Sequence, residues 1–175
     1  MLDFSRNHFD LFGLPMRYGV DPAALDAAYR ALQTEVHPDR FAGANDADKR
    51  LALQASARVN EAYRALKDPV QRAQYLLSLN GVDAVGETDT QLPLDFLERQ
   101  LERREEASEA LADADERTLS SLREAVLADA REIEDRLARE LDGGGDYVSA
   151  RPLVRELTFL AKLADDIDAM AGSLD

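Results

Sequence analysis

The chain has 175 residues, which allows one domain or two small ones, since single domains usually run to about 100 to 200 residues. Hydrophobic residues make up 45% of the composition and charged residues 32%, enough to bury a core, so wholesale disorder is excluded. The absence of cysteine excludes a disulfide scaffold, a thiol nucleophile, a Cys-ligated zinc site and a directly held iron–sulfur cluster. The formal charge of −14 arises beyond residue 80, because residues 1–80 carry 10 basic and 10 acidic residues whereas residues 81–175 carry 11 and 25. This asymmetry indicates two units with different partners and argues against nucleic-acid binding, which needs a basic face.

Targeting and membrane signals are not evident in the sequence. The N-terminus carries Asp3 and Asp10 and has no basic run ahead of a long apolar core, so it does not predict a secretory signal. No stretch approaches the roughly 18 consecutive apolar residues that a membrane span needs. We therefore expect a soluble intracellular protein without a membrane partner.

The first 80 residues predict antiparallel helices in a small domain. Asp21-Pro22 is a strong helix start, because Asp caps free backbone N–H groups and Pro tolerates the first helical turn. That helix ends at His37-Pro38, because a proline stops it. A second helix begins at Asn45 or Asp46 and ends at Asp68-Pro69, which opens a shorter third helix. The apolar positions with helical spacing are Leu25, Ala28, Tyr29, Leu32 and Val36 in the first helix and Leu51, Ala55, Val59, Ala62 and Leu66 in the second.

Residues 81–92 have the composition of a linker, with two glycines, acidic residues and threonines. The shift in charge begins at the same point. Two independent signals therefore place one boundary here, between a domain at 1–80 and a domain at 93–175.

The second domain predicts three helices. The first pattern runs from Pro93 to Ala112, the second starts near Asp115 and is broken by the run Gly143 to Gly145, and the third follows it. Heptad-like stripes with charges between them indicate helices packed nearly antiparallel in a three-helix bundle. A single long coiled coil is disfavoured by the triple glycine. The stripes consist of Leu119, Leu122, Val126, Ala130, Ile133, Leu137 and Leu141, and of Leu153, Leu157, Leu160, Ala164, Ile167 and Ala171.

Catalytic chemistry has little support in the residues. The two histidines, His8 and His37, are far apart in sequence, and an isolated His-Pro-Asp tripeptide is more often a turn than an active site. No glycine-rich phosphate loop is present, and the many paired carboxylates on the later helices are typical of solvated faces. We predict no catalytic residue, no metal site and no cofactor.

The His-Pro-Asp turn gains meaning from the helices on both sides of it. An amphipathic helix, then His37-Pro38-Asp39-Arg40-Phe41, then a polar loop and a second amphipathic helix with Asn60, Ala62 and Tyr63 resemble a J domain. The resemblance implies an exposed loop presented to a DnaK-type chaperone ATPase, whose ATP hydrolysis the contact stimulates. The residues fit that use, because Pro38 fixes the loop and Asp39 is able to pair with an arginine of the partner.

Longer segments are similar to the HscB family, the co-chaperones of iron–sulfur cluster assembly. They are DLFGLP from Asp10, HPDRF from His37, QASARVNEAYRALKDPVQRAQYLLSLNG from Gln54, FLERQLERREE from Phe96 and RELTFLAKL from Arg155. The resemblance implies that the first domain engages an HscA-type or DnaK-type chaperone and that the bundle binds an IscU-type scaffold protein. The lack of a cysteine-rich zinc module points to the bacterial form, which implies the bacterial cytoplasm.

Site residues follow from matching this chain to the family motifs. The resemblance assigns chaperone binding to His37, Pro38, Asp39 and Arg40, and scaffold binding to Leu97, Leu101, Glu102, Glu105 and Phe159. Phe159 lies about 100° around the helix from the seam residue Leu160, so it need not be core. Two alternatives for Phe159 are that it flanks the bundle core or that it packs against the first domain.

Two departures from the family pattern concern charge. The helix before the loop sets Arg30 against Asp26 and Glu35, where many J domains are basic, which favours a dedicated partner over general electrostatic steering. Glu98 occupies a position that is usually bulky and apolar in the family.

Two rival functions come from other classes. A general J-domain co-chaperone for unfolded clients needs a broad client-binding surface. An enzyme with His37 as its base needs a pocket and a second catalytic group.

Overall fold

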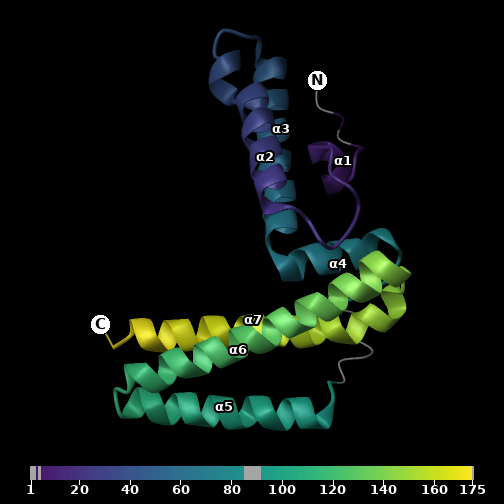
Figure 1. Ribbon diagram of the computed structural model, residues 1–175. Coiled ribbons are helices and arrows are strands. Elements are labelled where there is room, and N and C mark those ends of the chain that lie inside the picture. Colours follow the sequence, from purple (N-terminus) through teal and green to yellow (C-terminus); the bar gives the residue numbers. More distant parts are fainter. Residues whose placement is uncertain (1–2, 4, 85–91, 175) are drawn as a thin grey trace. The chain divides into compact units, whose positions relative to one another are not determined.

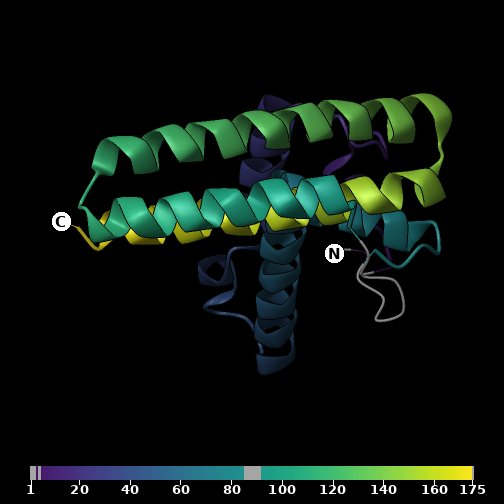
Figure 2. The same cartoon turned by 90° about the horizontal axis from the view of Figure 1, so that it is seen from below.

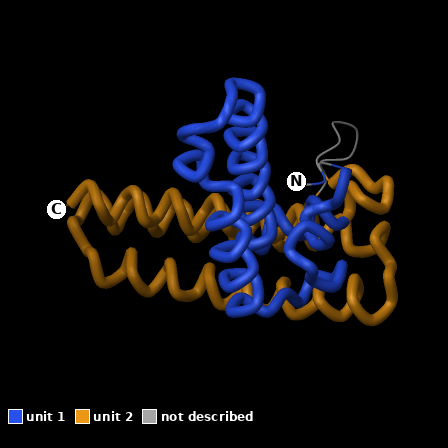
Figure 3. The backbone as a smooth tube through the Cα atoms, turned by 90° about the horizontal axis from the view of Figure 1, so that it is seen from above, with its two compact units in different colours: residues 1–76 blue, residues 77–175 orange. Residues whose placement is uncertain are grey.

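The computed structural model describes residue 3 and residues 5–84 and 92–174. Every regular element in these residues is a helix (Figure 1), which confirms the predicted all-α class. The chain divides into two compact units, residues 1–76 and residues 77–175, which Figure 3 distinguishes by colour. The linker expected at 81–92 falls for the most part on residues 85–91, which lie outside the described residues.

Unit 1 is built around an antiparallel hairpin of α2 (Pro22–Val36) and α3 (Asp46–Lys67). Both helices begin at the predicted caps. The Asp21 side chain accepts a hydrogen bond from the Ala23 N–H at 2.9 Å, and the Asn45 side chain accepts one from the Asp48 N–H at 2.9 Å. A short 3-10 turn, η1 (Pro38–Phe41), follows α2. The hairpin core is apolar and consists of Leu25, Val36, Ala52, Ala55, Val59, Ala62 and Leu66.

A short helix that sequence patterning did not predict, α1 (His8–Phe12), packs on this hairpin. Asn7 caps its first turn, and Gly13 ends it at φ 65°, a left-handed conformation that suits glycine. Phe9 is fully buried. Five residues are too few to show a helical period, so the sequence signal was limited to the flanking cap residues.

The last helix of unit 1, α4 (Pro69–Leu79), starts inside that unit, and its final three residues belong to unit 2. Within unit 1 its Tyr75 ring stacks on His8 with 4.0 Å between centroids, and its hydroxyl accepts a hydrogen bond from the His8 backbone N–H at 3.0 Å. Arg72 lies over the Tyr18 ring at 4.8 Å. These contacts join α4 to α1 and to the loop that precedes α2.

Unit 2 contains the predicted bundle of three long helices, α5 (Leu94–Ala112), α6 (Glu116–Ala138) and α7 (Tyr147–Gly172), as Figure 2 shows. The predicted stripes of α6 and α7 are buried from Leu119 to Leu141 and from Leu153 to Ile167, whereas Ala171 is not. α5 adds Phe96, Ala107 and Ala110 to this core.

The end of α6 differs from the prediction that the triple glycine breaks a helix reaching Leu141. The α-helix ends at Ala138 and continues as a π-helical segment, η2 (Arg139–Gly144), that contains the first two glycines. Only Gly145, at φ 63°, reverses the chain before α7. The wider π-turn keeps Leu141 buried.

No helix in residues 5–84 or 92–174 is both long enough and apolar enough to cross a membrane.

Candidate functional site

The loop at the tip of the unit 1 hairpin presents His37 and Asp39 to solvent. His37 ends α2 and Pro38 opens η1, so the chain turns sharply between two fixed elements. The Asp39 backbone N–H donates to His37 Nδ1 at 3.3 Å, while the two side chains remain 55% and 91% exposed. The loop therefore holds a local shape and keeps its polar groups accessible.

Arg40 reaches back toward the helix that precedes the loop. Its guanidinium Nη1 donates to the Thr34 backbone oxygen at 3.2 Å, a carbonyl in the last turn of α2 that no helical N–H can satisfy. Arg40 thus braces the loop against α2 while remaining exposed.

A polar and aromatic cluster ties α2 to α3 beside the hairpin core. The rings of Tyr29 and Tyr63 stack with 4.0 Å between centroids, and the Tyr29 hydroxyl donates to Asn60 Oδ1 at 2.9 Å. The Tyr63 hydroxyl donates to Asp26 at 2.7 Å, and Gln33 donates to Asn60. Polar contacts of this kind fix the register of the two helices and hence the position of the loop at their tip. Helical periodicity placed Tyr29 on the apolar face but does not reveal these partners.

The two acidic residues of α2, Asp26 and Glu35, stand in different relations to its basic residue Arg30. The hydrogen bond from Tyr63, aided by the nearby Lys67 ammonium, lowers the pKa of Asp26, so this carboxylate is already satisfied within the hairpin. Glu35 lies about 140° around the helix from Arg30. Arg30 is exposed about two turns before His37, and its charge also contributes to the lowered pKa of Asp26, one turn earlier on α2.

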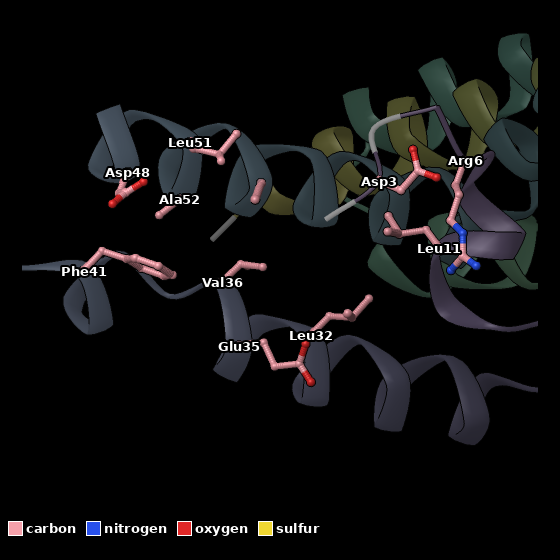
Figure 4. A pocket seen from close by; sticks show the side chains of 11 residues that line it. Asp3, Arg6, Leu11, Leu32, Glu35, Val36, Phe41, Asp48, Leu51 and Ala52 are labelled. Carbon is pink, nitrogen blue, oxygen red and sulfur yellow. The ribbon is translucent and has the colours of Figure 1, made fainter. Parts of the chain in front are cut away.

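A pocket of about 680 Å³ lies behind the loop within unit 1 (Figure 4). Val36 and Phe41, the residues that flank the His37 to Arg40 segment, line it together with Leu32 of α2. Its charged lining residues are Asp3, Arg6, Glu35 and Asp48. His37 does not line the pocket, so the enzyme hypothesis, which needs His37 in a pocket with a second catalytic group, gains no support from it.

On unit 2, α5 carries the residues that family resemblance assigned to the scaffold. Leu101 is 59% exposed, Leu97 is half-buried, and Glu102 and Glu105 are exposed. Their spacing sets Leu97, Leu101 and Glu105 in one strip along the helix, whereas Glu102 lies about 100° further around from Leu101. The structure thus brings three of the four α5 residues onto one line and places the fourth at its side.

Phe159 of α7 borders α5 and is half-buried. Its ring meets that of Phe96 edge to face, with 5.8 Å between centroids, and the Arg104 guanidinium lies 5.6 Å from the ring centroid. Arg104 also donates to Asp166 of α7 at 2.8 Å. Phe159 is therefore a flank of the bundle core that remains partly accessible beside α5.

A buried polar group holds α5 on the opposite flank, and sequence patterning did not identify it. Gln100 is fully buried, and its Oε1 accepts a hydrogen bond from Arg103 at 3.1 Å. Arg103 in turn donates to Asp129 of α6 at 2.8 Å. The only sequence signal was the position of Gln100 four residues after the core residue Phe96.

Within the described residues no group of three or more His, Cys, Asp or Glu side chains is placed to hold a metal ion.

Comparison with known proteins identifies both units. The DnaJ domain family matches residues 7–75, and the family described as the HSCB C-terminal oligomerisation domain matches residues 92–168. A DnaJ domain with an exposed His-Pro-Asp loop, followed by this second domain, defines a J-domain co-chaperone.

Relatives extend the match to the whole chain. It is 46% identical to the co-chaperone protein HscB homolog of Burkholderia multivorans, over 100% of this chain and 99% of the relative. Among solved structures it is similar to the chaperone HscB from Vibrio cholerae, with a TM-score of 0.84, 37% identity and coverage of 97% of this chain and 100% of that one. The human co-chaperone protein HscB gives a TM-score of 0.87 at 28% identity, covering 95% of this chain and 83% of that one.

The chain belongs to the HscB family of co-chaperones. This membership confirms the resemblance drawn from the sequence, the fold of a J domain followed by a helical bundle, and the function as a co-chaperone of iron–sulfur cluster assembly.

Proposed function

We propose that this co-chaperone is an adaptor with one partner for each unit. The loop of His37, Pro38, Asp39 and Arg40 binds an HscA-type or DnaK-type chaperone and stimulates its ATPase. The bundle binds an IscU-type scaffold protein through Leu97, Leu101, Glu102, Glu105 and Phe159. The protein itself catalyses no reaction in this scheme.

The chaperone half of the proposal rests on the loop of His37 to Arg40, which is both ordered and exposed. Asp39 is 91% exposed, and its nearest ionic partner is His37, with 3.6 Å between Asp39 Oδ2 and His37 Nδ1. A carboxylate in that state is free to form a charge-assisted pair with an arginine of the chaperone. Arg40 and the tyrosine cluster reduce the entropy lost on binding, because they already order the loop and the hairpin.

The strip on α5 supports the scaffold half of the proposal. An exposed leucine such as Leu101 gains free energy when a partner covers it, and a nearby aromatic such as Phe159 is a common hot spot. The carboxylates of Glu102 and Glu105 fit a partner surface with basic residues around an apolar centre.

Linking the two contacts explains why neither needs to be tight. A scaffold held by the bundle is tethered to a chaperone held by the loop, which raises the effective concentration of one at the other. The proposed arrangement is a J domain at 1–80, a linker at 81–92 and the scaffold-binding bundle at 93–175. The proposed location is the bacterial cytoplasm, in line with the bacterial sources of the relatives.

Single-turnover ATP hydrolysis by a purified HscA-type chaperone tests the loop assignment. The wild-type protein is expected to accelerate hydrolysis, and His37→Gln is expected to lose that effect. Gln54→Ala, a change at an exposed residue of α3 outside the loop, is the matched control and is expected to stimulate like the wild type. Equal stimulation by His37→Gln and the wild type contradicts the assignment.

Calorimetric titration with an IscU-type scaffold tests the bundle assignment. The combined change Leu97→Ala, Leu101→Ala and Phe159→Ala is expected to abolish binding, because it removes the apolar centre of the surface. Unchanged affinity contradicts the assignment. A general co-chaperone for unfolded clients is instead expected to bind a denatured model protein, with no preference for the scaffold.

A further inference from the structure

An exposed leucine stands at the beginning of α5, outside the set of residues assigned to the scaffold. Leu94 is the first residue of the helix and is 70% exposed. It lies three residues before Leu97 and seven before Leu101, a spacing that aligns all three on one side of the helix. We call these three residues the leucine ridge, and it spans about 10 Å.

Half of the large exposed apolar side chains in the described part of unit 2 lie on this ridge. The large hydrophobic residues that are exposed in the described part of the unit are Leu79, Leu94, Leu101 and Val148. Two of these four belong to the ridge, and the half-buried Leu97 lies between them. Single exposed leucines are common on protein surfaces, whereas neighbouring apolar side chains form a patch that a partner is able to cover.

The charges beside the ridge indicate what kind of partner surface covers it. Glu98, Glu102 and Glu105 are exposed on the neighbouring positions of α5, and the neighbouring cation Arg104 is paired with Asp166 of α7. An apolar row bordered by carboxylates fits a row of apolar side chains bordered by lysine or arginine. The ridge is also continuous with the proposed scaffold surface, because Leu97 and Leu101 belong to both.

Leu94 lies on the same strip of α5 as the charged residue Glu98. Glu98 places an exposed carboxylate beside the apolar residues of this strip. Leu94 lies one helical turn before Glu98 and restores apolar area at the N-terminal end of the same strip.

We propose that Leu94 is a further binding residue for the scaffold protein and that the binding surface extends one turn beyond Leu97, toward the start of α5. This inference rests on the proposed function of the bundle. It assigns the scaffold protein an apolar contact opposite Leu94, at the end of a basic-rimmed surface.

Calorimetric titration of the full-length protein with a purified IscU-type scaffold tests the proposal. Leu94→Ala is expected to weaken binding about tenfold, the loss that follows from removing a leucine buried at an interface. Val148→Ala is the matched control, because Val148 is also 70% exposed in the first turn of a bundle helix but lies outside the ridge. Its affinity is expected to equal that of the wild type.

Leu101→Ala distinguishes a failure of the extension to Leu94 from a failure of the scaffold surface itself. If Leu101→Ala weakens binding and Leu94→Ala does not, the extension to Leu94 is overturned while the scaffold surface stands. If neither change affects binding, the bundle surface itself is wrong and the extension falls with it. Equal helical circular dichroism of all variants ensures that a loss of affinity is not a loss of folding.

A second copy of this chain is the competing occupant of the ridge. Sedimentation velocity across a concentration series detects it as self-association. Wild-type dimers that dissociate on Leu94→Ala, together with unchanged scaffold affinity, overturn the proposal in favour of a homodimer contact. Monomers throughout, with weakened scaffold binding by Leu94→Ala, are the expected result.

Discussion

Arg104 of α5 lies over the ring of Phe159 of α7, with its guanidinium carbon 5.6 Å from the ring centroid. The same guanidinium is held by Asp166 at 2.8 Å. The ring of Phe159 is thus fixed from two sides, by a cation on its face and by Phe96 edge to face, while part of it stays accessible. This arrangement sets the orientation of an aromatic residue that we assign to the scaffold surface.

Arg104→Ala is expected to loosen this corner of the bundle. Loss of one cation–π contact and one surface ion pair is expected to lower the free energy of unfolding by about 1 kcal/mol. Scaffold affinity is expected to fall as well, because Phe159 is then no longer held in place. Urea unfolding and calorimetry measure the two effects.

Arg99→Ala is the control for that change. Arg99 lies on the flank of α5 that faces α6 and is 3.9 Å from Asp129, so it does not contact Phe159. A loss of affinity in Arg99→Ala equal to that in Arg104→Ala contradicts a specific role for Arg104 at the ring.

Gln100→Leu is expected to stabilise the bundle. Gln100 is fully buried, and its Nε2 has no hydrogen-bond partner among the described residues. A leucine of similar size removes that buried polar group, and Arg103 keeps its ion pair with Asp129. The free energy of unfolding is expected to rise by about 1 kcal/mol, measured by urea unfolding, with scaffold affinity unchanged. A loss of stability indicates instead that the Gln100 to Arg103 contact outweighs the unpaired amide.

Glu98→Leu is expected to tighten scaffold binding. The position is exposed and borders the leucine ridge, so a leucine there adds apolar area to the proposed interface and removes a charge that loses water on binding. Affinity measured by calorimetry is expected to rise several-fold. Weaker binding instead shows that the Glu98 carboxylate meets a basic group of the scaffold.

His8 is expected to make the stability of unit 1 depend on pH. Burial, together with the charge of Arg58, lowers the pKa of His8 below its ordinary value of 6.5. Below pH 6.5 the unfolded chain therefore binds a proton that the folded chain does not, so stability is full above that pH and falls as the pH drops toward the folded pKa. Thermal unfolding between pH 5 and 8 measures this fall.

The chain offers its own control for the pH experiment, since His8 and His37 are its only histidines. His8→Phe is expected to flatten the pH dependence near pH 6, because a phenyl ring still stacks on Tyr75 but does not titrate. His37→Gln removes the other histidine and keeps His8, so the dependence assigned to His8 is expected to remain. A flat profile in the wild type contradicts the prediction.

Local patterns in the sequence predicted most of the helices. The side chains of Asp21, Asn45, Asp115 and Asp146 cap helices by accepting a hydrogen bond from a backbone N–H of the first turn. The first three of these mark helix starts that the sequence predicted. Helix α1 was not predicted because it is shorter than two turns. The π-helical end of α6 was not predicted because the run Gly143 to Gly145 indicates a break in a helix.

The candidate sites were predictable only in part. The loop at His37 could be identified because its residues are consecutive and lie between two patterned helices. The setting of Phe159 could not, because Arg104 of α5 reaches its ring only when the bundle forms, and Asp166, which holds the Arg104 guanidinium, lies 62 residues after Arg104. The same holds for Gln100, whose partner on α6 is reached through Arg103. Such polar contacts between helices leave no periodic trace in the sequence, unlike the apolar stripes that predicted the bundle.

Steady-state ATP hydrolysis by the chaperone, with and without saturating scaffold, tests most directly whether one chain couples the two partners. With scaffold present, the concentration of wild-type protein that gives half-maximal stimulation is expected to fall about tenfold or more, since the tethered partners raise each other's effective concentration. The combined change Leu97→Ala, Leu101→Ala and Phe159→Ala is expected to show no such fall, and His37→Gln is expected to give no stimulation in either condition. A wild-type half-maximal concentration that is the same with and without scaffold contradicts the adaptor mechanism.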